Sequence, residues 1–406
     1  MKIFHGWRVA AAGSSIHFLH SALLLQAFGA YVAVLSEERG WSKTALAGGA
    51  ALQSIEGAVL GPLLGWMVDR FGPRVMVQGG IVVLSLGFLA LSRVDSIGGF
   101  YGAMVLIAIG ASFSGYFPLS VALVHWFKRW RARALSLMSL GLAAGGIAAP
   151  LVGWAMQTYG WRNMALASAV ITLCVGLPLA RVVRNKPADI GETPDGLRLA
   201  PTVDAGGVAV VPSGRDFTAA EALRTRAFWL LGLGHGFALL VVAAVNVHAI
   251  SHIKEGLGYS LAQAALVITV MTMAQAGGVL LGALMGDRWN KRYVAAGCML
   301  AHMLGLLALT WATHIWMLGA FAVLHGTAWG LRGPFMQALR ADYFGLQAIG
   351  MILGLSAVII AMGQVAGPLI AGVFADLTGN YRAGFTILAL VAGSGSVLFM
   401  LAKKPQ

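Results

Sequence analysis

The stretch "WSKTALAGG…GWMVDR" (41–70) occurs a second time in altered form as "YSLAQAALV…GALMGDR" (259–288). Another pair of positions has the same separation. Pro150 in "APLVG" and Pro368 in "GPLIAG" are as many residues apart as Trp41 and Tyr259, the first residues of the two copies, and we call this separation the repeat offset. Self-similarity at a fixed offset is the mark of a duplicated structural unit. The repeat therefore predicts two similar halves, each of roughly half the chain.

The composition indicates that both halves lie in a membrane. The 406 residues are 58% hydrophobic and only 11% charged, with a mean hydropathy of +0.79. Soluble domains average about 45–50% apolar and about 25% charged residues. Glycine occurs 54 times, and small residues let helices approach closely in lipid. These values exclude an ordinary soluble enzyme, a disordered protein and a fibrous protein.

Twelve apolar runs are long enough to cross a bilayer, which takes about 20 residues each. They are approximately 9–34, 44–67, 75–92, 97–125, 134–158, 163–183, 227–252, 260–285, 293–313, 315–338, 348–374 and 383–402. We therefore predict an all-α membrane protein with twelve transmembrane helices in two pseudo-symmetric six-helix bundles.

One long polar segment divides these runs six and six. Residues 185–226 contain four prolines and six acidic residues. We predict an N-terminal bundle over 1–184, a linker over 185–226 and a C-terminal bundle over 227–406. Two similar bundles with a substrate site near the midplane between them are a known plan of secondary transporters.

The cations set the orientation. If the N-terminus is cytoplasmic and the helices alternate, 21 of the 28 Lys and Arg residues fall in cytoplasmic segments, six fall in outer loops and Arg332 lies within a helix. An excess of cations marks the cytoplasmic side. Both termini and the linker are therefore expected in the cytoplasm, and the formal charge of +13 needs no nucleic-acid partner.

The segment "GWMVDRFGPR" (65–74) resembles the loop between helices 2 and 3 of the major facilitator superfamily, whose pattern is roughly G-x-x-x-D-R-x-G-x-R. The matching residues are Gly65, Asp69, Arg70, Gly72 and Arg74. The second copy keeps Asp287 and Arg288 but has Ala283 at the first glycine position. The resemblance implies the major facilitator fold, transport by alternating access, and cytoplasmic gate contacts at these residues.

A finer resemblance concerns "HWFKRWRARALSLMSLGLAAGG" (125–146) and "YGWRNMALASAV" (159–170). These segments are similar to the monocarboxylate porter and oxalate/formate antiporter branch, which implies a small organic anion as the substrate. Members of this branch often carry a basic residue in helix 8 or helix 11. Residues 260–285 and 348–374 hold no cation here, so the anion-binding cation is not at its usual place.

Glu56 lies about mid-way along the second helix, with Gln53 one turn earlier on the same helical face. A charge at the centre of a membrane helix costs about 2.5–3.5 kcal/mol, and intramembrane acids are therefore functional by default. We interpret Glu56 as a proton-coupling carboxylate or a polar substrate contact. The alternative is a neutral glutamic acid that hydrogen-bonds a neighbouring helix.

Arg332 is the second charged residue deep within a helix. His325, Trp329 and Arg332 are spaced i, i+4, i+7 and form one stripe. A cation beside an aromatic side chain suits an anionic substrate, because a guanidinium binds a carboxylate with two hydrogen bonds. The alternative is an arginine that snorkels or caps a helix break at Pro334.

Histidines supply a second set of proton carriers. His17 and His20 share a face of the first helix, and histidine titrates near neutral pH. They form a proton-relay pair or a pair of hydrogen-bonded packing residues. Further polar candidates for the cavity are Tyr116, Asn246, Gln275 and Gln364.

The sequence contains no enzyme signature. A Walker motif, a nucleophile–base–acid set and a carboxylate cluster are all absent. Cys174 and Cys298 both lie in apolar runs and predict no metal site. We expect no cofactor.

We therefore predict a monomeric, proton-coupled secondary transporter of a small organic anion in a bacterial-type inner membrane. The alternatives are an exporter of drugs, siderophores or other organic molecules, and a transport-like membrane receptor.

The orientation predicts opposite labelling of two introduced cysteines. Ser213 lies in the linker, whereas Ser96 lies in an outer loop. In intact cells, a membrane-impermeant thiol reagent is expected to label Ser96→Cys and to leave Ser213→Cys unlabelled until the cells are opened. Labelling of Ser213→Cys in intact cells would contradict the orientation.

Overall fold

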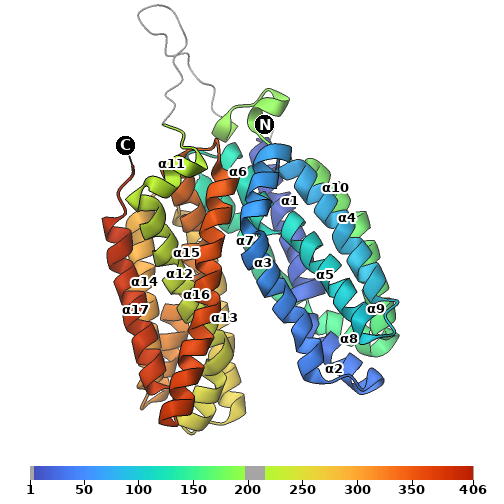
Figure 1. Cartoon of the computed structure of the whole chain (residues 1–406), viewed down its shortest axis with the longest axis vertical. Coiled ribbons are helices and arrows are strands. Elements are labelled where there is room, and N and C mark those ends of the chain that lie inside the picture. The colour runs from blue at the N-terminus through green and yellow to red at the C-terminus, as the bar shows by residue number, and fades with distance from the viewer. Residues whose placement is uncertain (1–3, 197–214, 406) are drawn as a thin grey trace, which may run out of the picture. The chain divides into compact units, whose positions relative to one another are not determined.

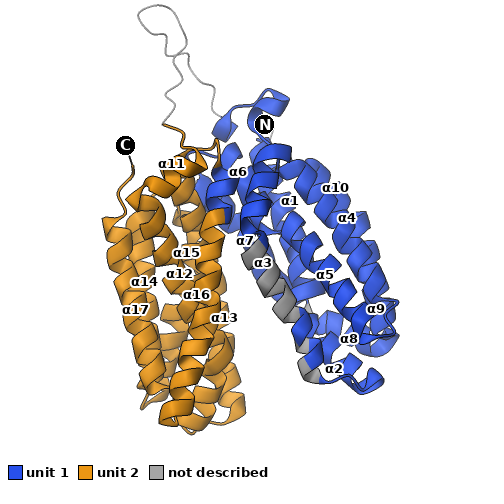
Figure 2. Ribbon diagram, in the orientation of Figure 1, with its two compact units in different colours: residues 1–214, 349–354 blue, residues 215–348, 355–406 orange. Residues whose placement is uncertain are grey.

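The computed structural model describes residues 4–196 and 215–405, apart from the side chains at 43, 44, 47, 50–59 and 149. In this part of the chain every regular element is a helix. It divides into two compact units, shown in Figure 2. Unit 1 comprises Met1–Gly214 with Ile349–Gly354, and unit 2 comprises Arg215–Ala348 with Leu355–Gln406.

Unit 1 is a bundle of helices that run side by side (Figure 1). Its elements in chain order are α1 (His5–His20), the π-helical turn η1 (Ser21–Leu25), α2 (Phe28–Arg39), α3 (Lys43–Phe71), α4 (Pro73–Leu91), α5 (Ile97–Ser114), α6 (Tyr116–Trp126), α7 (Arg131–Ile147), α8 (Ala149–Tyr159), α9 (Trp161–Ile171), the π-helical turn η2 (Thr172–Gly176) and α10 (Leu177–Val182). Two short 3-10 helices, η3 (Pro187–Ile190) and η4 (Pro194–Gly196), follow.

Unit 2 is a second helical bundle (Figure 1). Its elements are α11 (Ala219–Arg224), α12 (Arg226–Ser251), the π-helical turn η5 (His252–Gly256), α13 (Leu261–Met285), α14 (Lys291–Thr310), α15 (Ile315–Phe344), α16 (Ile349–Thr378) and α17 (Arg382–Leu401). The first residues of α16, Ile349–Gly354, belong to unit 1.

The long helical segments are membrane spans. Among the described residues, nine helical segments are long and apolar enough to cross a bilayer, and the bent pair α7–α8 makes a tenth. α3 and α15 have 29 and 30 residues, which exceeds the roughly 20 that a span needs. α15 carries His325, Arg332 and Arg340, which lower its hydropathy. The protein is an integral membrane protein of the all-α class, as predicted.

Glycines allow the closest helix contacts. A Cβ on Gly141 of α7 would collide with the backbone oxygen of Ser14 on α1. In unit 2, a Cβ on Gly367 of α16 would collide with the backbone oxygen of Leu240 on α12. Such contacts let two helix backbones touch directly. This close packing holds helices together in lipid, where the hydrophobic effect does not drive their association.

One end of unit 1 is held by a carboxylate shared between two arginines. Asp95, in the loop after α4, accepts hydrogen bonds from Arg39 at the end of α2 (2.9 Å) and from Arg162 near the start of α9 (2.8 Å). These two guanidinium groups hold the pKa of Asp95 below its usual range. Arg162 also donates to the backbone oxygens of Ser92 and Val94, which explains its place in the "GWR" segment.

Candidate functional site

The fourth span of unit 1 is interrupted at Gly115. α5 ends at Ser114 and α6 begins at Tyr116, and Gly115 between them has an extended conformation (φ −88°, ψ −153°). We expected one continuous helix over 97–125, so this break is a new finding. Broken spans are typical of transporter binding sites, because they present backbone groups within the membrane.

His20 on α1 faces this break. The Ser114 hydroxyl donates to the backbone oxygen of Gly110 at 2.6 Å, and the same Oγ lies 3.2 Å from Nε2 of His20. A hydroxyl has one proton to donate, so His20 is the donor in the second contact. Neutral His20 therefore carries its proton on Nε2 and a lone pair on Nδ1. This Nδ1 lies 3.7 Å from the position that a Cβ on Gly115 would occupy.

His17 and Tyr116 complete this cluster. The His17 ring stacks against His20 at a centroid distance of 6.5 Å and lies 5.6 Å from the ring of Tyr116. His17 is 5% exposed, and its Nε2 atom has no hydrogen-bond partner among the described residues. An unsatisfied buried polar atom is costly and marks a place where a proton, a water molecule or a ligand can bind.

α1 also changes its geometry at this point. The π-helical turn η1 begins at Ser21, directly after His20, and such turns occur frequently at functional sites. The Ser21 hydroxyl donates to the backbone oxygen of Leu142 on α7 at 2.8 Å. Gly145 allows this approach, because a Cβ there would collide with the side chain of Ser21.

Unit 2 contains a buried arginine that the sequence analysis missed. Arg340 on α15 was counted with the cytoplasmic cations, yet it is 1% exposed and its Nη1 lies 3.2 Å from Nδ1 of His235 on α12. A guanidinium only donates. His235 is therefore the acceptor, which requires a neutral ring with its proton on Nε2.

Arg332 lies in the interior of the same unit. It is 1% exposed, although a guanidinium carries a permanent charge. Of the expected stripe, His325 and Arg332 are buried and Trp329 is half-buried. α15 continues through Pro334 without a break, so Arg332 caps no helix end there.

His302 and His325 form a second histidine pair. Their Nδ1 atoms are 3.1 Å apart, and both residues are completely buried. One ring must donate and the other accept, so the two rings hold opposite tautomers when neutral.

The polar residues of the two units occupy equivalent places in the repeat. The offset that relates the two copies of the repeat also relates His17 to His235 and Ser114 to Arg332. In unit 1 the position in the fourth span holds a neutral hydroxyl, whereas in unit 2 it holds a permanent cation. The repeat offset could have identified His235 from the sequence, but no sequence signal distinguished Arg340 from a surface cation.

Among the described side chains, three other polar candidates make no hydrogen bond to these clusters. Asn246 and Gln364 are exposed, and Gln275 is partly buried. Gln53 and Glu56 lie on α3, but their side chains lie outside the described residues.

The "GWMVDRFGPR" motif lies at the end of α3 and the start of α4. Asp69 accepts hydrogen bonds from the backbone N–H groups of Gly350 and Met351, both at 2.8 Å, in the first turn of α16. A carboxylate at a helix N-terminus satisfies free N–H groups and complements the helix dipole. Gly65 is needed here, because a Cβ would lie 2.5 Å from the backbone oxygen of Gly350.

The other residues of this motif shape the turn. Gly72 has a positive φ of 79°, a conformation that favours glycine. The N–H of Arg74 donates to Asn185 at 2.9 Å, and the guanidinium of Arg70 lies 5.5 Å from the ring centroid of Trp66.

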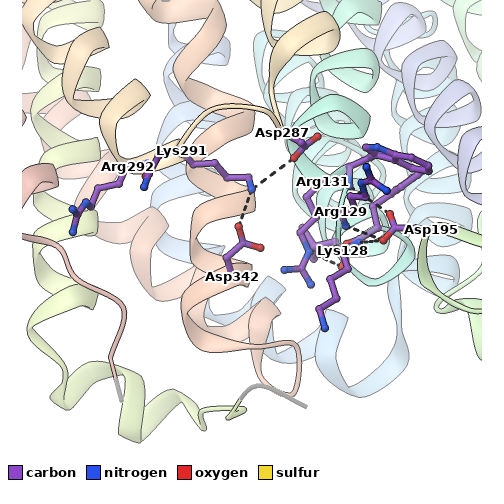
Figure 3. Close-up of polar contacts among 12 residues, drawn as sticks. Lys128, Arg129, Arg131, Asp195, Asp287, Lys291, Arg292 and Asp342 are labelled. Carbon is purple, nitrogen blue, oxygen red and sulfur yellow. Dashed lines mark hydrogen bonds and ion pairs between the residues drawn. The ribbon is translucent and has the colours of Figure 1, made fainter. Parts of the chain in front are cut away.

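The corresponding loop of unit 2 is held by Lys291. Its Nζ lies 2.9 Å from a carboxylate oxygen of Asp342 on α15 and 3.7 Å from one of Asp287 (Figure 3). Arg288, the other predicted residue of this loop, is exposed. In the part of the chain that the structure describes, no three His, Cys, Asp or Glu side chains are grouped to hold a metal ion.

A family model described as Major Facilitator Superfamily matches residues 14–248 and, in a second match, residues 231–406. The chain belongs to the major facilitator superfamily. The twelve-helix fold of this superfamily and its transport class, as opposed to an enzyme, are therefore confirmed.

Curated relatives and solved structures agree with this assignment. Monocarboxylate transporter 11 of Homo sapiens is 28% identical over 410 residues, which cover 97% of this chain and 82% of that protein. Monocarboxylate transporter 13 of Bos taurus is 25% identical over 406 residues, 97% of this chain and 88% of that protein. These relatives confirm the predicted resemblance to the monocarboxylate-porter branch.

Two solved structures show the fold. The human organic anion transporter MFSD10 has a TM-score of 0.72 at 16% identity, with 98% of this chain and 100% of that chain covered. The E. coli fucose:proton symporter FucP has a TM-score of 0.68 at 15% identity, with 99% and 97% covered.

The geometry of Asp69 leads to a mutational prediction. Asp69→Asn keeps the shape but leaves one carbonyl oxygen for two N–H donors and removes the charge. We expect turnover to fall about ten-fold, while expression and substrate binding change less than two-fold. Uptake into proteoliposomes and binding to purified protein measure the two quantities, and wild-type turnover in this variant would contradict a gate role for Asp69.

Proposed function

We propose that this superfamily member is a secondary transporter that moves a small organic anion, a monocarboxylate, together with a proton by alternating access. We place it in a bacterial-type inner membrane as a monomer with both termini in the cytoplasm. The observation that carries the proposal is the cluster of buried histidines, His17 and His20, at the break of the fourth span. The full-length similarity to monocarboxylate transporters supports the choice of substrate.

His20 supports the proton part of the proposal. Its hydrogen bond to Ser114 assigns the proton to Nε2 and leaves a lone pair on Nδ1, beside the helix break at Gly115. A histidine in this state can take up a proton without first losing its existing hydrogen bond. His17, with an unpartnered Nε2 at 5% exposure, offers a second acceptor one turn away. Glu56 is the alternative proton carrier.

The arginines of unit 2 support the anion part. Arg332 and Arg340 are both 1% exposed, and Nη1 of Arg340 lies 3.2 Å from Nδ1 of His235. His235 and Arg332 correspond by the repeat to His17 and Ser114, so unit 2 holds a permanent cation at the place where unit 1 holds a hydroxyl. A carboxylate bound away from bulk water interacts more strongly with a guanidinium than it does in solution. The spans over 260–285 and 348–374, in α13 and α16, contain no cation, which leaves Arg332 as the leading ligand for the carboxylate.

The proton carrier can be identified by two isosteric variants. In His20→Gln, the amide nitrogen replaces Nε2 as donor to Ser114 but cannot titrate, and Glu56→Gln likewise removes a titrating carboxyl. We expect the variant at the true carrier to lose pH-driven accumulation at least ten-fold while retaining substrate exchange. Accumulation and counterflow of labelled monocarboxylates in proteoliposomes with an alkaline interior measure both activities. His314→Gln, at an exposed position before α15, is the matched control.

Two outcomes would count against this assignment. If both variants accumulate substrate at the wild-type rate, neither group carries the proton. If wild-type proteoliposomes show neither accumulation nor exchange of any monocarboxylate, the proposed function itself is wrong, and an exporter of other organic molecules becomes the leading candidate.

The anion ligand can be tested at Arg332. A charge-assisted hydrogen bond contributes about 1.5–3 kcal/mol, and each 1.4 kcal/mol is a factor of ten. Arg332→Gln should therefore weaken carboxylate binding by roughly 10- to 150-fold. Arg332→Lys should restore it only in part, because lysine lacks the planar fork.

Calorimetric affinity and melting temperature are measured on the same Arg332 variants. A lower melting temperature with unchanged affinity would assign Arg332 to the stability of the bundle and would remove it from the substrate site.

A further inference from the structure

In the first part of the linker between the two units, the carboxylate of Asp195 is bound by a loop of unit 1. Asp195 accepts hydrogen bonds from the backbone N–H groups of Lys128 (3.1 Å), Arg129 (2.8 Å) and Trp130 (3.4 Å), as Figure 3 shows in part. These residues form the loop between α6 and α7. Successive N–H groups that converge on one anion form a nest. Asp195 is 6% exposed and has a left-handed backbone (φ 61°), so its conformation serves this contact.

The other end of the linker is fixed to unit 2 in a related way. Asp216 accepts a hydrogen bond from the backbone N–H of Leu346 at 2.9 Å, in the loop between α15 and α16. The next residue, Phe217, donates its N–H to the backbone oxygen of Phe344 at 2.9 Å and buries its ring against that side chain. Gly345 is required, because its φ is +77° and a Cβ there would collide with the Asp216 carboxylate.

The two anchoring points are equivalent in the repeat. The repeat offset relates Lys128 to Leu346, and it also relates Arg131 to Ile349, the first residues of α7 and α16. At each end of the linker, a carboxylate therefore binds a backbone N–H at an equivalent position of the repeat. These positions are Lys128, shortly before α7, and Leu346, shortly before α16. A polar segment that served only to connect two bundles would need no such pair of contacts.

The loop of unit 2 leads directly into the helix that Asp69 caps. Leu346 is bound by Asp216, and the N–H groups of Gly350 and Met351, about one helical turn later in the chain, are bound by Asp69. A loop held at Leu346 has few remaining ways to present the first turn of α16. The conformation of that turn therefore depends on the linker as well as on the motif in α3.

We propose that Asp195 and Asp216 are positioning residues for the gate: they fix the two equivalent loops so that α7 and α16 start in the conformation that gating requires. This inference rests on the gate role in the proposed function. The linker is then a structural part of the transport machinery, fixed at both ends, and its aspartates act through the loops rather than on the substrate.

Hydrogen exchange at residue resolution tests the positioning role without reference to any substrate. In Asp216→Ala, exchange is expected to become about ten-fold faster at Leu346 and also at Gly350 and Met351. In Asp195→Ala, the same increase is expected at Lys128, Arg129 and Trp130 and in the first turn of α7. The melting temperature of each variant is measured alongside to exclude global unfolding.

Conservative variants and a control sharpen the test. Asp216→Asn keeps an acceptor oxygen for the N–H of Leu346 and should restore wild-type exchange, whereas Asp195→Asn should do so only in part, because Asp195 uses both oxygens. Asp189→Ala is the matched control, since this linker carboxylate is exposed and binds the nearby N–H of Lys186. In transport assays, turnover should fall at least five-fold in both alanine variants at Asp195 and Asp216, with KM changed less than two-fold.

Three results would overturn the inference. Faster exchange at Leu346 alone would show that Asp216 is only a local cap. Equal loss of turnover in Asp189→Ala would show that any change in the linker disturbs transport. Unchanged turnover in both alanine variants would separate the linker from gating. If no monocarboxylate is transported at all, the exchange data still decide the positioning role, so failure of the proposed function is recognised separately.

Discussion

A bilayer offers no hydrogen-bond partners, so polar groups within it depend on partners inside the protein. This constraint governs the candidate site. Ser114 is satisfied by Gly110 and by His20, and Arg340 is bound to His235. Because serine has one proton and arginine has no acceptor, these partners fix the tautomers of both histidines. The hydrogen-bond partners thus determine which nitrogen of each histidine is protonated and which is left to accept a proton.

The duplication distributes this chemistry over both units. Equivalent positions hold His17 and His235, and also Ser114 and Arg332. The two halves differ in charge at one of these positions, because unit 1 has the hydroxyl of Ser114 where unit 2 has the guanidinium of Arg332, a cation that does not lose its proton. A duplicated scaffold can in this way supply a proton site and an anion site from a single plan. The linker aspartates follow the same symmetry, since Lys128 and Leu346 are equivalent.

The sequence predicted those features that leave a long or repeated signal. Apolar runs identify spans because backbone groups in lipid must be paired within helices. The motif around Asp69 could be identified because its glycines and charged residues occur at a fixed spacing. Features that depend on tertiary contacts left no such signal. Nothing local marked the break at Gly115, since glycine is common in membrane helices. From the sequence, Arg340 is indistinguishable from a surface cation, because its partner His235 on α12 is distant in the chain. The sequence indicated only a polar connection over the linker, because the partners of Asp195 and Asp216 are backbone N–H groups of loops that are distant in the chain.

The helix starts link the linker to the motif. Both Asp69 and Asp216 bind backbone N–H groups, which every residue except proline possesses. Such contacts tolerate change in the side chains of the loops but not loss of the carboxylate, and they can form and break without rearranging a packed core. A transporter that alternates between states needs contacts of this kind, strong enough to define one state and local enough to be released. Carboxylates at helix starts meet both conditions, whereas the glycine contacts of α7 with α1 and of α16 with α12 pack the interior of each unit.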